Sequence, residues 1–433
     1  MHMNIATAPR ERFKIALRKK WHLFYHGVKK VFNLLFGNTQ EKIGHVVYYP
    51  PVKDKTVLAG LVNRVGWYLP QSPFLRVKTT IPIDKDLVNT KIEHLSPPLS
   101  QYNYIHNMHD IQLTKKSRHL WSNADMILVW NQKSMFNPRI WRHIGKTGIV
   151  DPAYYLGTEN GIYQRIYRDY LDNEDQREFL KLSKENYQSL LERLSNFNKG
   201  YLFGTGPSLD RAPEFNCNDG FCIVCNSIVK NKSLLHHIKP QLIVFADAVF
   251  HFSPCRYSVT FRQMMLEAVQ EFQSYIMVPA QYVPLYLAHY PELGNKIIGM
   301  PICDKKYNFP TVNNFYVQRS TNIMTLFMLP VASAVADEIF IIGADGRKPD
   351  ENYFWQHSSS SQLNNLMQTV FDTHPAFFRD RIYTDYYNEH CRLLENSIKH
   401  GESRGKRYYS LTPSYIPVLA NCLKNTSKGV EYM

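Results

Sequence analysis

The sequence lacks several features that would place it in a specialised class of protein. No apolar run among its 433 residues reaches the length of a transmembrane helix, and the first 20 residues contain no continuous apolar segment of the secretory type. We therefore expect a cytoplasmic protein. Cysteine is scarce: seven scattered residues, an odd number, fit a reducing compartment better than a disulfide framework.

Acidic residues are too few to balance the basic ones. The chain has 51 Lys and Arg against 37 Asp and Glu, which gives a formal net charge of +14. Such a surplus favours anionic partners, such as nucleic acid, acidic lipid or a phosphorylated substrate. Hydrophobic residues, in contrast, make up 44% of the chain, so we expect a globular protein rather than a disordered one.

The basic surplus is concentrated near the N-terminus. Between Arg10 and Lys30 there are eight Lys and Arg but only one acid, Glu11. Apolar and aromatic residues recur in the same stretch at near-helical spacing, which predicts a basic amphipathic helix within an arm of residues 1–38. Such a helix binds an anionic membrane surface and would place the protein on the inner face of the cell membrane. The alternative is a helix docked on the protein's own core.

The rest of the chain divides near residue 198. Residues 39–197 form an N-terminal α/β region that ends in a strongly helical pattern over 172–197. From residue 198 to 433, apolar strands alternate with helical patterns, which predicts an α/β domain with a doubly wound, mostly parallel sheet.

Small or polar residues follow five strands of this second region. In a doubly wound sheet the ligand binds at the carboxyl ends of the strands, so these positions are candidates for ligand contact. They are Gly204 to Ser208, Asn226, Asp247, Asp345, and Thr412 to Ser414.

The turn "FGTGPSL" (203–209) raises the question of what its backbone approaches. Gly204 and Gly206 carry no side chain, so the chain there can come close to another group, for example a phosphate. The turn lacks the third glycine of a dinucleotide fingerprint and the Gly-Lys-Ser/Thr end of a P-loop. By itself, the motif favours an ordinary strand-to-helix turn.

No convincing metal site is present. Cys217, Cys222 and Cys225 lack the second spaced pair of a zinc site, and two of them lie within one strand, so we expect buried thiols. Asp84 and Asp86 match the Asp-x-Asp pattern that holds a divalent ion, but such short patterns recur by chance. We expect no metal cofactor.

Several segments of the second region match a known family in order and approximate spacing. They are "YLFGTGPSLD", "CIVCNSIV", "LIVFADAVFHF", "QRSTNIMTLFMLPVASAVADEIFIIGADG" and "LLENSIKHGESRGKRYYSLTPSYI". Together they resemble the bacterial sialyltransferases of glycosyltransferase family forty-two, and the wider Gly-x-Gly-Pro-Ser-Leu set that includes the motility accessory factors. The resemblance covers roughly residues 200–420 and does not reach residues 1–195.

The resemblance implies a Rossmann-like domain with a lid. It also implies an inverting, metal-independent transfer of a nonulosonic acid from a CMP-activated donor to a cell-surface glycan or glycolipid, such as lipopolysaccharide or capsule. The donor is then a substrate, and no cofactor is needed. The residues implied in donor binding are Gly204, Thr205, Gly206, Pro207, Ser208 and Asn226 for CMP, Asp247 for the sugar, Ser320, Thr321 and Asn322 for carboxylate and phosphate, and Asp345, Thr412 and Ser414 at further strand ends.

The resemblance also implies catalytic residues. Tyr353 corresponds to one of two lid tyrosines that assist the departing phosphate, and Arg347 lies near the position of the other. The general base of the family is a lid histidine, and the match is ambiguous between His374 and His390. We favour His374, because Pro375 follows it and keeps it out of a helix interior. His357 ranks third.

Three other functions remain open. The first is a transferase that uses another nucleotide sugar, the second is a noncatalytic partner in glycan assembly, and the third is a basic protein that binds nucleic acid or membrane. Against nucleic acid, the basic residues cluster in one amphipathic helix, and no DNA- or RNA-binding motif is found. We therefore expect no nucleic-acid partner.

Overall fold

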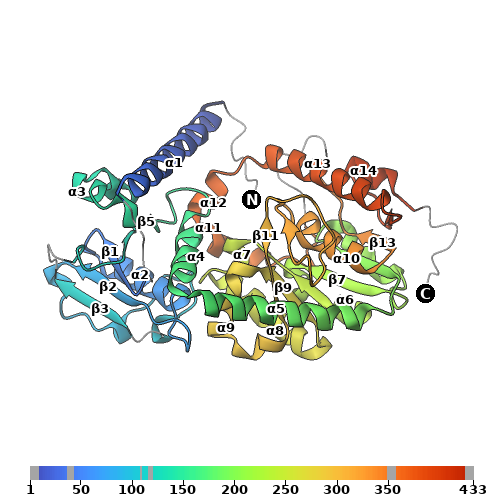
Figure 1. The fold of residues 1–433 in the computed structure, drawn as a ribbon, viewed down its shortest axis with the longest axis horizontal. Coiled ribbons are helices and arrows are strands. Elements are labelled where there is room, and N and C mark those ends of the chain that lie inside the picture. The colour runs from blue at the N-terminus through green and yellow to red at the C-terminus, as the bar shows by residue number, and fades with distance from the viewer. Residues whose placement is uncertain (1–8, 37–42, 108–109, 116–119, 349–356, 425–433) are drawn as a thin grey trace.

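The computed structural model describes residues 9–36, 43–107, 110–115, 120–348 and 357–424, and shows two α/β units side by side (Figure 1). The first unit contains a five-stranded sheet in the order β3-β2-β1-β4-β5, in which every neighbouring pair is parallel. Its elements are β1 His45–Tyr49, α2 Lys55–Tyr68, β2 Lys78–Ile83, β3 Ile111–Lys115, β4 Met126–Val129, α3 Pro138–Trp141, β5 Thr147–Ile149 and α4 Thr158–Tyr170.

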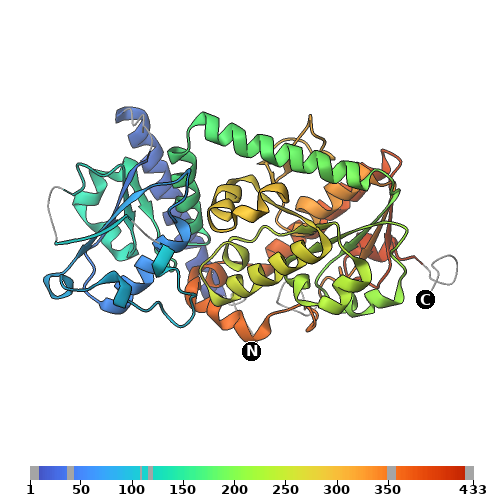
Figure 2. The same ribbon diagram turned by 90° about the horizontal axis from the view of Figure 1, so that it is seen from below.

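Helix α5, Asn173–Leu194, leads from the first unit into the second. Asp172 begins it with a capping box, in which Asp172 and Asp175 each accept a backbone N–H of the other. The helix runs along the second unit in both views (Figures 1 and 2). There the Asn186 amide donates to the Ile297 carbonyl at 2.8 Å, which ties α5 to the edge strand β10.

The second unit is built on a seven-stranded, all-parallel sheet in the order β10-β9-β8-β7-β6-β13-β14. Strands β7 and β9 are buried at every position, as expected for a parallel sheet covered on both faces. The strands are β6 Lys199–Phe203, β7 Phe221–Cys225, β8 Leu242–Val244, β9 Tyr275–Pro279, β10 Ile297–Met300, β13 Glu338–Ile342 and β14 Arg407–Ser410, beside a small sheet of β11 Ile302–Cys303 and β12 Val317–Gln318.

Helices cover this sheet and its strand ends. They are α6 Lys232–Ile238, α7 Ala248–His251, α8 Arg256–Phe272, α9 Val283–His289, α10 Leu329–Val335, α11 Met367–Thr373, α12 Pro375–Arg379, α13 Tyr383–Glu402 and α14 Pro417–Asn421. From β6 the chain builds outward through β7 to β10, and it then returns to place β13 on the other side of β6. The topological switch point, where such sheets bind ligands, is therefore between β6 and β13.

The predicted fold class is confirmed: the second unit is a doubly wound parallel sheet of Rossmann-like type, preceded by an α/β region and an N-terminal helix. Three of the five strands in the first unit have no clear signal in the sequence. Strand β2 (KTTIPI) and strand β3 (IQLTK) are rich in polar residues and Pro, and β5 has only three residues. Short polar strands give no clear apolar run, so they were not recognisable.

The two units are joined by a buried interface around Trp67 at the end of α2. The Trp67 indole N–H donates to the Phe252 carbonyl of the second unit at 2.9 Å. One ring face stacks on His289, with ring centroids 4.3 Å apart, and the guanidinium carbon of Arg262 lies 3.9 Å from the Trp67 ring centroid. The whole side chain is buried, so the contact is part of the core shared by the two units.

Helix α1, Pro9–Phe36, lies along the outer side of the first unit (dark blue in Figure 1). The Tyr25 hydroxyl donates to the Thr147 carbonyl at 3.2 Å, and Lys29 donates to the same carbonyl. One face of the arm is thus docked on the protein's own core, as the alternative reading of the sequence expected. In the part of the chain that the structure describes, no helix combines the length and apolarity needed to cross a membrane.

Candidate functional site

A cavity of about 450 Å³ opens at the carboxyl ends of β6, β7, β8 and β13. We call it the strand-end cavity. Its volume is within the range of small-molecule sites, and its position is the switch point between β6 and β13. The chain segments that line it are the strand ends at Gly204–Thr205, Cys225–Ser227, Ala246–Ala248 and Gly343–Ala344, the turn 320–324, and residues of α12, α13 and the segment between them.

The glycine turn approaches another loop of the protein. A Cβ at Gly206 would lie 2.1 Å from Oδ2 of Asp345, and a Cβ at Gly204 would lie 2.5 Å from the carbonyl oxygen of Gly343. The backbone N–H groups of Gly204 and Gly206 both donate to carbonyls of the β13 end, at 2.8 Å. The glycines therefore allow the loops after β6 and β13 to pack together. Within the turn of residues 203–209, Gly204 and Thr205 line the cavity.

Ser208, Asp345 and Thr412 form a polar network behind this turn. The Ser208 hydroxyl donates to Oδ2 of Asp345 at 2.8 Å and lies 2.9 Å from the Thr412 hydroxyl. Ser414 similarly donates to the carbonyl of Ala344 at 2.7 Å. These residues bind the ends of β6, β13 and β14 to one another. Together with Gly206 and Pro207, they lie outside the cavity lining, so their predicted contact with the donor stays a prediction.

Asn226 and Asp247 follow β7 and β8 and both line the cavity. Asn226 has a φ of 51°, an uncommon conformation for a residue other than glycine. Within the described residues its side-chain amide has no hydrogen-bond partner, so it is available to a ligand. Asp247 caps α7 by accepting from the Val249 N–H at 3.1 Å. Burial raises the pKa of the Asp247 carboxyl, against the opposing charge of Arg381.

Ser320, Thr321 and Asn322 form a turn at the cavity wall. Asn322 accepts the N–H of Met324 at 2.8 Å, and the Ser320 hydroxyl bonds to that of Thr325, so both are committed to the turn. The Thr321 hydroxyl is buried and has no partner among the described residues. A π-helix, Met324–Met328, follows, a rare element that is frequent at functional sites. Thr321 is thus the member of this triplet best placed to bind a ligand.

Arg381 is the cation of the cavity, and no motif in the sequence indicates it. Among the described residues that line the cavity, it is the only Lys or Arg. Its guanidinium carbon lies 4.0 Å from the ring centroid of Phe377 and 4.7 Å from that of Tyr386, so two aromatic rings fix its position. The only signal was the composition of "RDRIYTDYY" (379–387), which is dense in Arg and Tyr.

Arg347, the cation that the resemblance suggested, lies outside the cavity lining. Its guanidinium carbon lies 4.7 Å from the ring centroid of Tyr387 on α13. Its predicted contact with the donor phosphate stays a prediction. Tyr353 falls outside the described residues.

Three histidines line the cavity: His251, His357 and His390. The Nδ1 atom of His251 accepts the backbone N–H of Asp247 at 3.1 Å, so its ring proton is on Nε2. Nδ1 of His357 lies 2.8 Å from the Thr205 hydroxyl. His390 is presented by α13, and its side chain is buried. Of the two histidines between which the sequence left the base undecided, only His390 is at the cavity.

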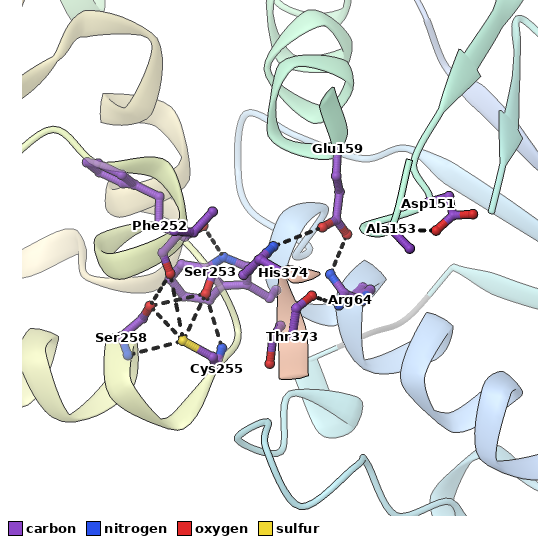
Figure 3. A network of polar contacts seen from close by, with 12 residues as sticks. Arg64, Asp151, Ala153, Glu159, Phe252, Ser253, Cys255, Ser258, Thr373 and His374 are labelled. Atoms are coloured by element: carbon purple, nitrogen blue, oxygen red, sulfur yellow. Dashed lines mark hydrogen bonds and ion pairs between the residues drawn. The ribbon is translucent and has the colours of Figure 1, made fainter. Parts of the chain in front are cut away.

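His374 lies in a buried ionic network (Figure 3). Its Nδ1 is 3.5 Å from Oε2 of Glu159, and Oε1 of Glu159 accepts from Arg64 at 2.5 Å. Arg64 also donates to the carbonyl of Thr373 at 2.8 Å. All of these side chains are nearly inaccessible to solvent, and none lines the cavity. His374 is the residue between α11 and α12, and its predicted role as the general base stays a prediction.

The other candidate metal ligands do not gather. Asp84 lies at the end of β2 in the first unit, where its carboxylate caps a short helical turn that contains Asp86. Cys217, Cys222 and Cys225 are buried free thiols. Within the described ranges, no group of three or more His, Cys, Asp or Glu side chains could hold a metal ion.

Comparison with known proteins gives a limited result. Neither a protein-family model nor a curated protein sequence matches the chain. Among solved structures it is similar to the sialyltransferase CstII from Campylobacter jejuni in complex with CMP-3FNeuAc, at 16% identity and a TM-score of 0.31. A second structure of CstII, with cytidine-5'-monophosphate, gives 15% identity and a TM-score of 0.29. Each match covers 55% of this chain and 91% of the other. At these values family membership does not follow.

The buried histidines predict that stability falls in mild acid. Burial lowers the pKa of His251 and His390 to about 3 and that of His289 and His357 to about 4. Below about pH 6.5 the unfolded chain binds protons at these sites that the folded protein does not bind. The free energy of unfolding is thus largest above that pH. We expect urea denaturation to show it decreasing by up to about 1.4 kcal/mol per pH unit for each such histidine between about pH 6 and pH 5.

The matched control for this prediction is His289→Gln. The Gln amide can still donate to the carbonyl of Trp67, which now lies 2.8 Å from Nε2 of His289. This variant is expected to show a smaller pH slope than the wild type. A free energy of unfolding that stays constant from about pH 7.5 to about pH 5 would contradict the prediction.

Proposed function

We propose that the protein is an inverting glycosyltransferase that moves a nonulosonic acid from a CMP-activated donor to a glycan acceptor. The observation that carries the proposal is the strand-end cavity. It lies at the switch point of a parallel sheet, where nucleotide ligands bind in such folds. One wall carries a carboxylate, Asp247, and a guanidinium, Arg381. The sequence resemblance of residues 200–420 supports the CMP-nonulosonate class of donor.

Donor binding is assigned to groups in the cavity that can form further hydrogen bonds. Asn226 and Thr321 both line the cavity, and the buried Thr321 hydroxyl has no partner among the described residues, although buried polar groups of this kind need one. We assign them to the nucleoside or the sugar. Arg381 is assigned to the phosphate, because a guanidinium donates two parallel hydrogen bonds to phosphate oxygens. The Asp247 carboxylate is suited to accept from sugar hydroxyls.

The proposed reaction breaks one bond and forms another at the anomeric carbon of the donor. The acceptor oxygen attacks that carbon, and the bond to the phosphate oxygen breaks with its electron pair leaving on CMP. Arg381, held by Tyr386, stabilises the negative charge that develops on the phosphate. The proton of the acceptor hydroxyl passes to His390, which lines the cavity and is neutral at neutral pH because burial lowers its pKa.

The acceptor is proposed to be a cell-surface glycan or glycolipid assembled on the cytoplasmic face of the membrane. The positive net charge of the chain is consistent with an anionic donor and an anionic acceptor surface. Because Arg381 supplies the positive charge at the phosphate, we propose that transfer needs no metal ion.

Nucleotide binding tests the proposal directly. CMP at about 100 times its Kd is expected to stabilise the folded protein by about 2.7 kcal/mol, a rise of a few degrees in Tm. UDP, GDP and ADP are expected to leave Tm nearly unchanged. Release of CMP from CMP-sialic acid, with and without excess chelator, then measures the reaction. A rise in Tm with UDP or GDP but not with CMP would remove the donor assignment and point to another nucleotide sugar.

A further inference from the structure

Helix α1 has an inner face that is docked on the protein. Ile15 and Tyr25 are buried, with exposed fractions of 5% and 2%. Nε of Arg18 donates to Oδ1 of Asp380, in the second unit, at 2.7 Å. The helix is therefore held to the folded body by apolar contacts and by a half-buried ion pair. Its orientation is fixed before it meets any partner.

The opposite face of α1 is apolar and exposed. Phe13, Leu17, Phe24 and Val31 are 69%, 57%, 54% and 54% exposed. They are four, seven and seven residues apart, so at 100° per residue they form one stripe along the helix, rotated about half a turn from Ile15 and interrupted by the exposed Lys20. Leu23 and Leu34, at 60% and 75%, widen the stripe on one side. Six large apolar side chains in water on one helix are not explained by the fold.

Basic side chains border this stripe on both sides. The same helical rotation places Arg12, Lys19 and Lys30 along one edge, and Arg10 and Lys14 along the other. All five are exposed. A solvent-facing apolar stripe between two rows of cations is the pattern of helices that lie in the headgroup region of an anionic bilayer. The long basic side chains can reach lipid phosphates while the stripe enters the acyl boundary.

A second element extends the apolar surface. Phe136, at the end of the short helix Gln132–Phe136, is 68% exposed and stacks on Trp21 of α1, with ring centroids 5.6 Å apart. The apolar surface thus continues from α1 onto the first unit. Because both elements are already folded, binding to a surface requires no ordering of the backbone.

We propose that the outer face of α1, together with Phe136, binds the surface of an anionic membrane while the inner face stays docked. We call this face the α1 outer face. The two readings of the arm from the sequence, membrane helix and docked helix, then apply to opposite sides of one helix. A second copy of the chain fits less well, because pairing two such faces would bring their rows of cations together. This inference does not depend on the proposed function.

Vesicle flotation of the full chain tests the apolar stripe. The wild type is expected to float with mixed phosphatidylcholine–phosphatidylglycerol vesicles, weakly with phosphatidylcholine alone, and less as NaCl is raised. The variant F13S/L17S/F24S is expected to bind the anionic vesicles about ten- to one-hundred-fold more weakly. The matched control is Leu99→Ser, which removes a side chain that is 87% exposed at a site remote from α1 in sequence, and which is expected to bind like the wild type.

A second variant tests the charges. R12Q/K19Q/K30Q is expected to lose about ten- to one-hundred-fold in affinity for the anionic vesicles, at about tenfold or less per charge, and little for neutral ones. The exposed Lys53 of the first unit provides its control, Lys53→Gln. All changed residues are exposed, so each variant should keep the Tm of the wild type and its response to CMP. These readouts separate failure of the membrane proposal from failure of the proposed function.

Three outcomes would overturn the proposal. The first is a wild type that does not float with anionic vesicles. The second is a serine variant that floats as well as the wild type. The third is a wild type that sediments as a dimer and a serine variant that sediments as a monomer, without any difference in vesicle binding, which would make the α1 outer face a contact between copies.

Discussion

Replacing Arg381 with Gln is expected to lower kcat/KM for sugar transfer by about 10²–10³-fold, the loss typical of removing one charge-stabilising donor from an active site. Arg381 is the only Lys or Arg among the described residues that line the strand-end cavity. Its loss leaves the departing phosphate without a positive charge in a site of low dielectric constant. Initial rates of CMP release at varied donor concentration give kcat and KM separately.

Two variants control for this effect. Arg381→Lys keeps the charge but not the planar fork, so an intermediate rate is expected. Arg347→Gln changes a residue outside the cavity lining and should leave the rate near that of the wild type. Because Arg381 contacts Phe377 and Tyr386, the Tm of each variant must be measured beside its rate. If Arg347→Gln is inactive and Arg381→Gln active, the cation suggested by the resemblance is the correct one.

His390→Ala is expected to lower kcat by about 10²–10⁴-fold with little change in the Kd for CMP. An acceptor hydroxyl needs a positioned base to lose its proton at neutral pH. The buried His390 is neutral there, since burial lowers its pKa to about 3. His390 lines the cavity, whereas the predicted base His374 does not. Single-turnover rates and CMP titrations distinguish a lost proton acceptor from lost binding.

The comparison with His374→Ala decides between the two histidines. His374 faces Glu159 in the network with Arg64, so its loss should lower the free energy of unfolding and leave kcat largely intact in the folded fraction. His357→Ala, which removes the contact with the Thr205 hydroxyl, serves as a second cavity variant. A folded His374→Ala protein without activity, beside an active His390→Ala protein, would return the base to His374.

The strand ends were predictable from the sequence because the strands of the second unit are continuous apolar runs. An apolar run such as "LIVFAD" ends visibly at its polar residue, so Asn226 and Asp247 could be placed at the ligand edge before the structure was known. The residues that pack against each strand end could not be predicted in the same way. Gly206 packs against Asp345, 139 positions later, because β6 pairs with β13, and no local pattern encodes that pairing.

Arg381 and His374 also show what the sequence could not predict. His374 was favoured as a free base because a proline follows it, but its environment is set by Glu159 and Arg64, which belong to the first unit. Arg381 was overlooked because it lies in the short connection between α12 and α13 and carries no motif. The partners of His374 are far away in the sequence, and only the packed structure brings Arg381 to the same cavity as the distant Asp247.

The burial of Trp67 between the two units has a consequence for how substrates reach the cavity. Many two-lobed enzymes swing their lobes apart about a hinge. Here, such a movement would have to pull Trp67 out from between His289 and Arg262, and would separate Arg64 from the carbonyl of Thr373. A hydrogen bond to a charged group contributes about 1.5–3 kcal/mol, and the buried Trp67 adds to it, so these contacts favour lobes that stay closed. We therefore expect donor and product to exchange by small, local displacements at the cavity mouth.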